Sequence, residues 1–343
     1  RRNESLQDVP QTVNVVTSEV IDKLRIFSAG DVASVVPGIS IESSSAGSGG
    51  FGQSQGIRGV PTFQTANASP TVQFYLNDAP ASTGLTSLLY DVGQIEVLKG
   101  PQGTLRGRSA PTGAITFTTK RADLNELGGT IILSGTTLDA INGQAAIGIP
   151  LIKDVLAIRV AGSLNHTEGN GVKSANSRLD PSFKAEGLRG SVRFEPGSNF
   201  TANVMYQRYW QKSRSFSQVT GLGNTIAANG PNGPAIRPGD RLGITDGAST
   251  GNSKIDYVVG QAEWRFGGQK LTYVGAYRDE SLISVSAQDG ANVIHGIEYF
   301  QNVNNASTEQ THELRLASED RVLGIFDYVI GGFYNKTTGR SNV

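Results

Sequence analysis

Hydrophobic and polar residues alternate with a period of two from about residue 128 to the end of the 343-residue sequence. In the segment DVLAIRVAGSL, the apolar residues Leu156, Ile158 and Val160 share one parity, and Arg159 takes the other. Successive side chains of a β-strand point to opposite faces. The pattern therefore predicts strands with one apolar and one polar face.

The same alternation recurs in LRGSVRFEP, FTANVMYQ, VVGQAEWRF and LTYVGAYRD. Alternation over about ten residues matches a strand that crosses a bilayer at a tilt. Aromatic residues lie on the apolar faces near strand ends, namely Trp264, Phe266, Tyr273 and Tyr277.

Short and long connections alternate between these strands. In an up-and-down barrel, all short turns then fall on one rim and all long loops on the other, as in outer-membrane barrels. A soluble β-sandwich or propeller also alternates and is the alternative on this pattern alone. Tight turns are expected at 153–154, 196–198, 267–268 and 319–320, and long polar loops near 166–183, 212–253 and 281–307.

The first 122 residues mix helix and strand signals. SEVIDKLRIF places Val20, Ile21, Leu24 and Phe27 on one helical stripe, and SAGDVASVVPG predicts a second short helix. A loop rich in glycine and serine follows, and then come several short apolar segments. We expect an α+β domain over residues 1–122 and a membrane β-barrel portion over residues 123–343.

Composition narrows the classes of function. The 30 basic and 30 acidic residues balance, so no overall charge favours nucleic acid as a partner. The absence of cysteine excludes disulfides and thiolate chemistry, and the three histidines are far apart, so we expect no metal site and no cofactor. No apolar run approaches the roughly 18 residues that a transmembrane helix needs.

The stretch QIEVLKGPQGTLRGRSAPTGAITFTTK, from Gln94 to Lys120, looks at first like a strand that leads into a phosphate loop. No G-K-[ST] motif follows, and GSGGFG further upstream lacks the strand and helix of a dinucleotide site. The serine in GRSAP lacks the flanks of a nucleophile elbow. Carboxylates such as Asp78, Asp91 and Glu96 have no convincing catalytic partner. The sequence therefore predicts no enzyme activity.

Five segments in a fixed order give a more specific prediction. They are SLQDVPQTVNVVTSEVI, GDVASVVPGISI, GIRGV, VQFYLNDAPAS and the stretch from Gln94, and a later THELRLAS follows in the barrel half. In this order they resemble the plug domain of TonB-dependent outer-membrane receptors. Arg106, Thr112 and Thr116 depart from the usual motif, and Arg106 has no explanation in the sequence. The motif positions that we expect to shape the plug core are Gly59, Gly100, Pro101, Gly103, Gly107 and Gly113.

The resemblance implies a receptor that imports a scarce external solute, most commonly a ferric siderophore. Corrinoids, haem, nickel chelates and oligosaccharides remain open. Such a barrel has about 22 antiparallel strands around an α+β plug, and we count about nine here, so we expect a fragment with its TonB-binding segment upstream of Arg1. Outer-membrane lipid is the expected surrounding. A soluble, secreted β-rich binding or adhesion protein is the alternative function.

The resemblance also implies roles for single residues. Basic residues of the IRG and IEVLxGP motifs, Arg58 and Lys99, are expected to latch the plug to carboxylates of the barrel, with Glu96 beside them; an ordinary surface ion pair is the simpler alternative. A loop at the plug apex is expected to contact the ligand, through Ser48, Phe51, Gln53 and Gln55.

Overall fold

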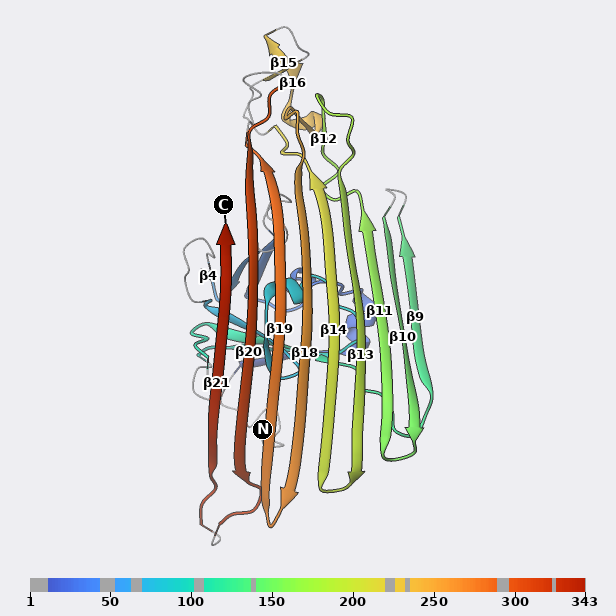
Figure 1. The fold of residues 1–343 in the computed structure, drawn as a ribbon, viewed down its shortest axis with the longest axis vertical. Coiled ribbons are helices and arrows are strands. Elements are labelled where there is room, and N and C mark those ends of the chain that lie inside the picture. Colours follow the sequence, from blue (N-terminus) through green and yellow to red (C-terminus); the bar gives the residue numbers. More distant parts are fainter. Residues whose placement is uncertain are drawn as a thin grey trace.

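The structure is a computed structural model of the chain, and it describes residues 12–43, 53–62, 70–101, 108–136, 140–219, 226–231, 235–288, 296–322 and 325–342. It contains a small mixed domain, which we call the plug, and a large antiparallel sheet, which we call the wall. Figure 1 shows the long wall strands side by side, with the plug behind them.

The plug is built on a five-stranded sheet in the order β1-β7-β8-β5-β6, and β2, β3 and β4 form a second, three-stranded sheet. All pairs in the larger sheet are antiparallel except β5 with β8. The elements are β1 (Thr12–Thr17), α1 (Ser18–Leu24), α2 (Ala29–Val32), β2 (Ile39–Ser43), β3 (Gln53–Ile57), β4 (Val60–Thr62), β5 (Val72–Leu76), β6 (Ala79–Ala81), a 3₁₀ turn (Thr83–Thr86), β7 (Val92–Lys99) and β8 (Gly113–Thr119).

The predicted first helix is shorter than its apolar stripe suggested. Helix α1 ends at Leu24 because Arg25 adopts a left-handed conformation, φ 54°, so Phe27 lies beyond it. A helix of seven residues has only two turns, and it buries Ile21 while Val20 and Leu24 remain exposed. The prediction of one helical stripe from Val20 to Phe27 was wrong for this reason.

The wall is one nine-stranded meander, in the order β21-β20-β19-β18-β14-β13-β11-β10-β9. Each long strand pairs antiparallel with the next long strand along the chain. The predicted antiparallel, up-and-down arrangement of about nine strands beside an α+β plug is confirmed. The strands are β9 (Gly128–Gly135), β10 (Ile141–Ile152), β11 (Leu156–Thr167), β13 (Ser182–Gly197), β14 (Phe200–Ser215), β18 (Ser249–Phe266), β19 (Gln269–Ala287), β20 (Phe300–Ser318) and β21 (Val329–Asn342).

Turns and loops lie at opposite ends of the wall, as Figure 1 shows. Tight turns at 153–155, 198–199 and 267–268 mark the lower rim. The upper rim carries the connections 168–181, 216–248 and 288–299. The tight turn predicted at 319–320 was wrong, because β20 ends at Ser318 and β21 begins only at Val329. No helix in the described part of the chain is long and apolar enough to cross a membrane.

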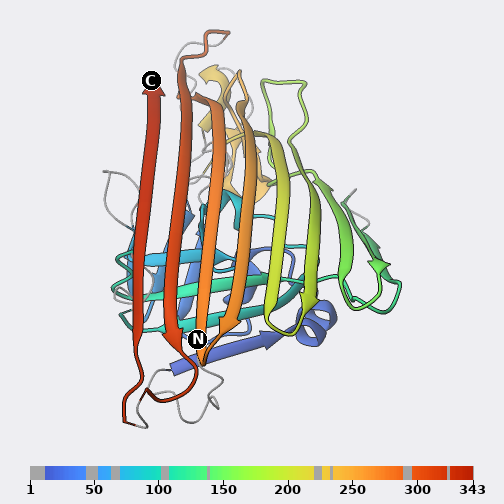
Figure 2. The same cartoon turned by 60° about the horizontal axis from the view of Figure 1, so that its bottom comes forward.

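The plug lies against one face of the wall, and Figure 2 shows its strands crossing the long strands. A single apolar cluster continues from the plug into the inner face of the wall. It joins plug residues such as Phe74 and Ile115 to wall residues such as Tyr209, Ile255 and Tyr257, all nearly inaccessible to water. The plug and the wall therefore share one core instead of having two.

Gly113 is the glycine on which the hairpin of β7 and β8 depends. It pairs with Lys99 at the start of β8 and has φ +152°, and a Cβ there would lie 2.3 Å from the Leu98 carbonyl oxygen and 2.8 Å from Ile57. The contact atom at the shorter distance is backbone, which cannot rotate away. Only glycine fits at this position.

We expect Gly113→Ala to lower the free energy of plug unfolding by about 2–4 kcal/mol, because the added methyl group combines backbone strain with overpacking. The measurement is the thermal unfolding of the full-length protein in detergent, recorded by calorimetry. Gly128→Ala is the matched control, since a Cβ at Gly128 meets nothing within 4 Å. Equal effects of the two substitutions would contradict this account.

Candidate functional site

The inner and outer faces of the wall differ in chemistry along each strand. On β11 the side chains of Ala157, Arg159 and Ala161 are buried toward the plug, whereas Val160 and Leu164 are exposed on the other side. The predicted parity of β11 is therefore confirmed. On this strand the inner face consists of small residues and one arginine, which leaves room for the plug and offers it a charged partner.

Wall side chains donate hydrogen bonds to backbone carbonyls of the plug. Turns and strand ends leave carbonyls that the plug sheets do not pair, and a buried carbonyl without a donor is costly. Because the acceptors belong to the backbone, the pairing does not depend on which plug side chains are present. The bonds run from Gln144 to Leu89, Arg189 to Tyr90, Arg193 to Ala122, Tyr257 to Pro80 and Gln261 to Asn77, at 2.5–3.4 Å.

Asp91 of the plug forms the best-buried ion pair of this contact. Arg159 on β11 donates from Nε and Nη2 to its two carboxylate oxygens, at 2.7 and 2.5 Å. The side chains are 10% and 6% exposed, so solvent screens the pair little. The two parallel bonds fix the orientation of the carboxylate as well as its distance. The partner of Asp91 was not predicted, because the two residues are 68 positions apart.

Tyr90, next to Asp91, packs against Gly187 of the wall, a residue without a side chain. A Cβ at Gly187 on β13 would lie 2.7 Å from the Tyr90 ring, so the ring occupies the space that only glycine leaves. The Arg189 guanidinium lies over the same ring, 4.3 Å from its centroid, in a cation–π contact. Burial raises the pKa of the Tyr90 hydroxyl, so the ring enters the contact in its neutral form.

A second charged contact joins the plug to the other side of the wall. Arg108 forms an ion pair with Glu309 on β20, and Glu309 also pairs with Arg278 on β19 at 3.1 Å. Arg278 lies 3.2 Å from Glu280 as well, which gives two guanidinium groups and two carboxylates in one network. Desolvation, and then the neighbouring Arg278, lower the pKa of Arg108. The plug contributes the cation of the Arg108–Glu309 pair and the wall contributes the carboxylate. The sequence analysis predicted the same distribution of charge for a latch.

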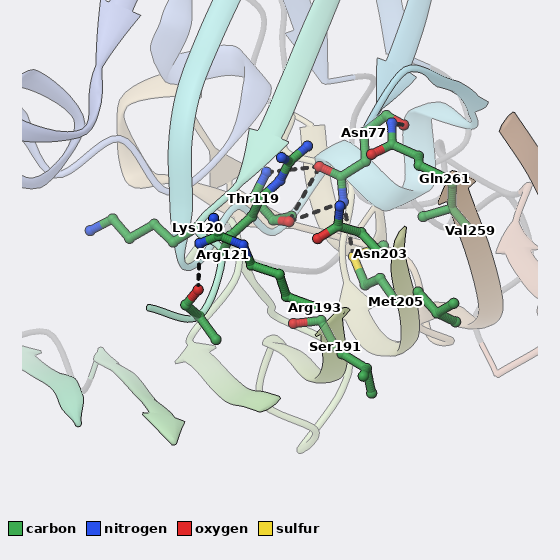
Figure 3. A pocket seen from close by; sticks show the side chains of 13 residues that line it. Asn77, Thr119, Lys120, Arg121, Ser191, Arg193, Asn203, Met205, Val259 and Gln261 are labelled. Carbon is green, nitrogen blue, oxygen red and sulfur yellow. Dashed lines mark hydrogen bonds between the residues drawn. The ribbon is translucent and has the colours of Figure 1, made fainter. Parts of the chain in front are cut away.

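A cleft opens between the lower part of the wall and the plug, as Figure 3 shows. Asn77 lies at its edge and connects the two domains: its amide nitrogen donates to Thr119 of the plug at 3.0 Å and lies 3.3 Å from the sulfur of Met205 on β14. Gln261 donates to the Asn77 carbonyl across the same cleft. The lining is mostly polar, and among described residues it contains no group of three that could hold a metal.

The three residues predicted for the latch lie on the plug, and their role stays a prediction. Arg58 is exposed at φ 56° in the turn between β3 and β4, and Lys99 donates from Nζ to the carbonyl of Pro37 at 2.7 Å. Neither forms an ion pair with another described residue of the chain. Glu96 lies on β7 and accepts a hydrogen bond from Gln94 at 2.9 Å.

The motif glycines are described in part. Gly59 and Gly100 have positive φ, 76° and 119°, and the Gly100 amide bonds the carbonyl of Thr112 at 2.9 Å. Thr112, an unusual residue at its position, donates its hydroxyl to the Thr71 carbonyl at 2.7 Å. Pro101 follows Gly100 on the surface. Gly103, Arg106 and Gly107 lie outside the described residues.

The predicted ligand contacts also stay a prediction. Gln53 and Gln55 lie on β3, and Ser48 and Phe51 lie outside the described residues.

The upper-rim loops contain small apolar clusters that the sequence analysis missed. Val219, Ile236 and Ile244 form one cluster, and Val172 and Phe216 belong to another. The short strands β12 (Lys173–Ser174) and β17 (Leu242–Gly243) pair in parallel between two loops, and β15 (Ile226–Pro231) pairs with β16 (Ala235–Ile236) within one of them. The isolated apolar residues within these polar segments were the signal that could have revealed them.

Comparison with known proteins adds independent evidence. Residues 5–114 match the family model described as TonB-dependent receptor plug domain. The pesticin receptor of Yersinia pestis is 37% identical over 118 residues, which cover 33% of this chain and 17% of the relative. The catecholate siderophore receptor Fiu of Escherichia coli K12 is 28% identical over 206 residues, 59% of this chain and 24% of the relative.

Solved structures extend the likeness to the wall. The ferric yersiniabactin uptake receptor FyuA from Yersinia pestis superposes with a TM-score of 0.76 at 19% identity, over 97% of this chain and 49% of that one. The siderophore receptor PiuA from Acinetobacter baumannii gives 0.71 at 19% identity, over 98% and 46%. The chain thus spans about half the length of the solved structures that it matches and less of its curated relatives. The fold of this chain is that of these two solved receptors, and a sandwich or propeller does not fit it.

We expect Asp91→Asn to lower the free energy of plug unfolding by roughly 3 kcal/mol, because it leaves the Arg159 guanidinium buried without a counter-charge. The measurement is calorimetric unfolding of the full-length protein in detergent. Asp22→Asn is the matched control, since Asp22 is 45% exposed and pairs with Lys120 on the plug surface, where a pair contributes at most about 1 kcal/mol. A loss no larger than that of the control would overturn the role given to Asp91.

Proposed function

Because this chain belongs to the TonB-dependent receptors of the outer membrane, we propose that it binds a scarce solute from outside the cell and admits it through the barrel with energy coupled by TonB. The barrel has no energy source of its own, so directional uptake needs a connection to the inner membrane. We propose TonB as the partner that supplies this connection. No covalent chemistry is needed, because a change in the population of plug states can release the ligand.

The observation that carries this proposal is the chemistry of the contact between plug and wall. A plug held only by apolar packing would need its core exposed before it could move. Here much of the contact consists of hydrogen bonds and ion pairs, such as those of Arg189, Arg108 and Asp91. Water that enters the lumen can replace these bonds one at a time, so the plug can rearrange while its own sheets stay intact.

We propose Arg58, Lys99 and Glu96 as a further part of the latch. Arg58 has an exposed side chain, and the Lys99 ammonium donates to a backbone carbonyl, that of Pro37, so both cations are available to carboxylates elsewhere in the lumen. In the same proposal, residues Ser48 to Gln55 contact the ligand from the plug apex. We also propose that the plug ends at residue 122 and that the barrel portion begins at residue 123.

A ferric siderophore is the solute class that we favour. Two relatives support it by their names, the catecholate siderophore receptor Fiu of Escherichia coli and a ferric-pyoverdine receptor of a Pseudomonas strain. A vitamin B12 transporter of Vibrio vulnificus, 24% identical over 210 residues, supports corrinoids as the second class. The upper-rim loops with their own small clusters are the part of this chain where selectivity between these classes would lie.

We expect deletion of the full-length gene to abolish uptake of at least one iron-55 siderophore complex. Complementation with the gene should restore this uptake only in cells that contain TonB. The measurement is accumulation of label with catecholate, hydroxamate and mixed-ligand complexes, with cobalt-57 cobalamin as the corrinoid arm. A strain that lacks TonB is the control for coupling. Unchanged uptake of every probe after deletion, or uptake that persists without TonB, would contradict the proposal.

A further inference from the structure

Three arginines form a descending row on the inner face of the wall, and all three reach the plug. Arg189 and Arg193 lie on β13, and Arg159 on β11 is the register partner of Ser191, midway between them. Each step of the row is therefore two residues, or about 6–7 Å along the strands. A Cβ at Gly148 on β10 would lie 3.2 Å from the Arg159 guanidinium, so the neighbouring strand leaves room for this long side chain.

This side of the lumen carries more cations than carboxylates. Among the described residues of β10, β11, β13 and β14, Glu195 is the one carboxylate on the inner parity, and it lies 2.8 Å from Arg193. Arg159 is paired with Asp91 of the plug, and Arg189 forms no ion pair within the described part of the chain. The wall strands on this side therefore hold two arginines for which they supply no carboxylate of their own.

The other side of the lumen carries both signs next to each other. Inner-facing side chains of β18, β19 and β20 form ion pairs within the wall itself, such as Arg265–Glu263, Arg278–Glu280 and Arg315–Glu313. An anion that crosses the lumen would therefore gain more from β11 and β13 than from these three strands.

Buried polar groups continue the row of arginines upward. The register of β10, β11 and β13 places Ser163 and Asn142 on the inner face above Arg189. The Ser163 Oγ and both polar side-chain atoms of Asn142 are buried and have no hydrogen-bond partner among the described residues. The same holds for the hydroxyl of Tyr90, which lies over Gly187, the register partner of Ser163. Because a buried polar atom without a partner is costly, these groups indicate a place that admits a polar solute when the plug moves.

The row ends at the cleft between plug and wall that Figure 3 shows. Arg193 lies in its lining with Lys120 and Arg121 of the plug, and the lining includes no carboxylate of the described residues. Outside the lining, Asp22 pairs with Lys120 at 2.9 Å, and Asp123 is a negative charge that acts on Arg193. Arg121 is exposed. The lower end of the row is therefore cationic and open to solvent.

We propose that the solute crosses the lumen between the plug and strands β11 and β13, along this row, and that it is an anion. The inference rests on the transport proposed above and narrows its solute class to a ferric catecholate complex. The oxygens of such a complex carry negative charge, which guanidinium groups bind strongly. An uncharged ferric hydroxamate would gain little from the row.

Arg159 can exchange one anion for another during this passage. While the plug is in place, both carboxylate oxygens of Asp91 accept hydrogen bonds from Arg159. When the plug shifts and withdraws this carboxylate, a catecholate oxygen can take the same donors. The guanidinium is then not left buried without a counter-charge, which would be strongly unfavourable. Arg189 above and Arg193 below offer the neighbouring donors.

The test compares the import of two iron-55 complexes, an anionic triscatecholate and an uncharged trihydroxamate. It uses cells in which the full-length protein is the only receptor for either complex. We expect the wild type to import the triscatecholate, and Arg121→Gln/Arg193→Gln to import it about twentyfold more slowly. An opposite charge at about 4 Å in water favours an ion by a factor of about five, and two charges are lost. Arg121→Lys/Arg193→Lys keeps both charges and should import the complex as the wild type does.

Arg265→Gln is the matched control. Arg265 lies at the same rim of the wall but outside the cleft, and its partners are Glu263 and Glu319. This variant should import the triscatecholate at the rate of the wild type. An equal loss of import in the control would overturn the proposal, because any cation at the rim would then have the same effect.

Equilibrium binding of the triscatecholate to cells that lack TonB separates passage from capture and folding. Arg121→Gln/Arg193→Gln should bind as much complex as the wild type, because both substitutions lie at the lower end of the row. Import at the wild-type rate, a loss of binding as large as the loss of import, or an equal loss of import in the lysine variant would each overturn the proposal. A wild type that imports the trihydroxamate and not the triscatecholate would overturn the solute class and leave the transport proposal standing. A wild type that imports no probe would contradict both.

Discussion

The hydrogen bonds from wall side chains to plug carbonyls are the interaction on which the rest of the structure depends. The plug strands cross the long strands, so the two sheets cannot share a ladder, and the turns of the plug would otherwise bury unpaired carbonyls. Gln144, Arg189, Arg193, Tyr257 and Gln261 supply the donors from three different strands of the wall. This need explains why long polar side chains such as Arg189 and Gln261 occupy positions on the inner parity, beside the apolar residues of the shared core.

The mixture of polar and apolar contact also sets how the two domains can separate. The shared apolar cluster holds the plug in place, but its wall members are mostly small or amphipathic, such as Ala161, Ala185 and Tyr257. Ion pairs at Asp91 and at Arg108 fix the plug at two positions on the wall, on β11 and on β20. Two separate charged contacts allow one side of the plug to be released while the other side stays attached.

The strand pattern of the wall could be predicted from sequence because each residue there faces one of two uniform surroundings. The parity of residues such as Leu156 and Leu188 predicts which face of β11 and β13 is apolar, and the structure agrees with it. The contact between plug and wall could not be predicted in the same way. Its acceptors are backbone atoms, which no residue type marks, and the Asp91–Arg159 pair joins positions far apart in sequence. Helix α1 was misjudged because a left-handed residue, Arg25, ended it before the apolar stripe did.

The place of Tyr90 against Gly187 has a consequence for how such receptors diverge. The ring fills the volume that a side chain at position 187 would need, so the two positions cannot change independently. A larger residue on β13 would be tolerated only in a lineage that had already lost the aromatic ring from its plug. The cation–π contact with Arg189 adds a third position to this coupling. Plug exchange between distant receptors should therefore succeed or fail on the match of these three residues, even where the rest of both domains is compatible.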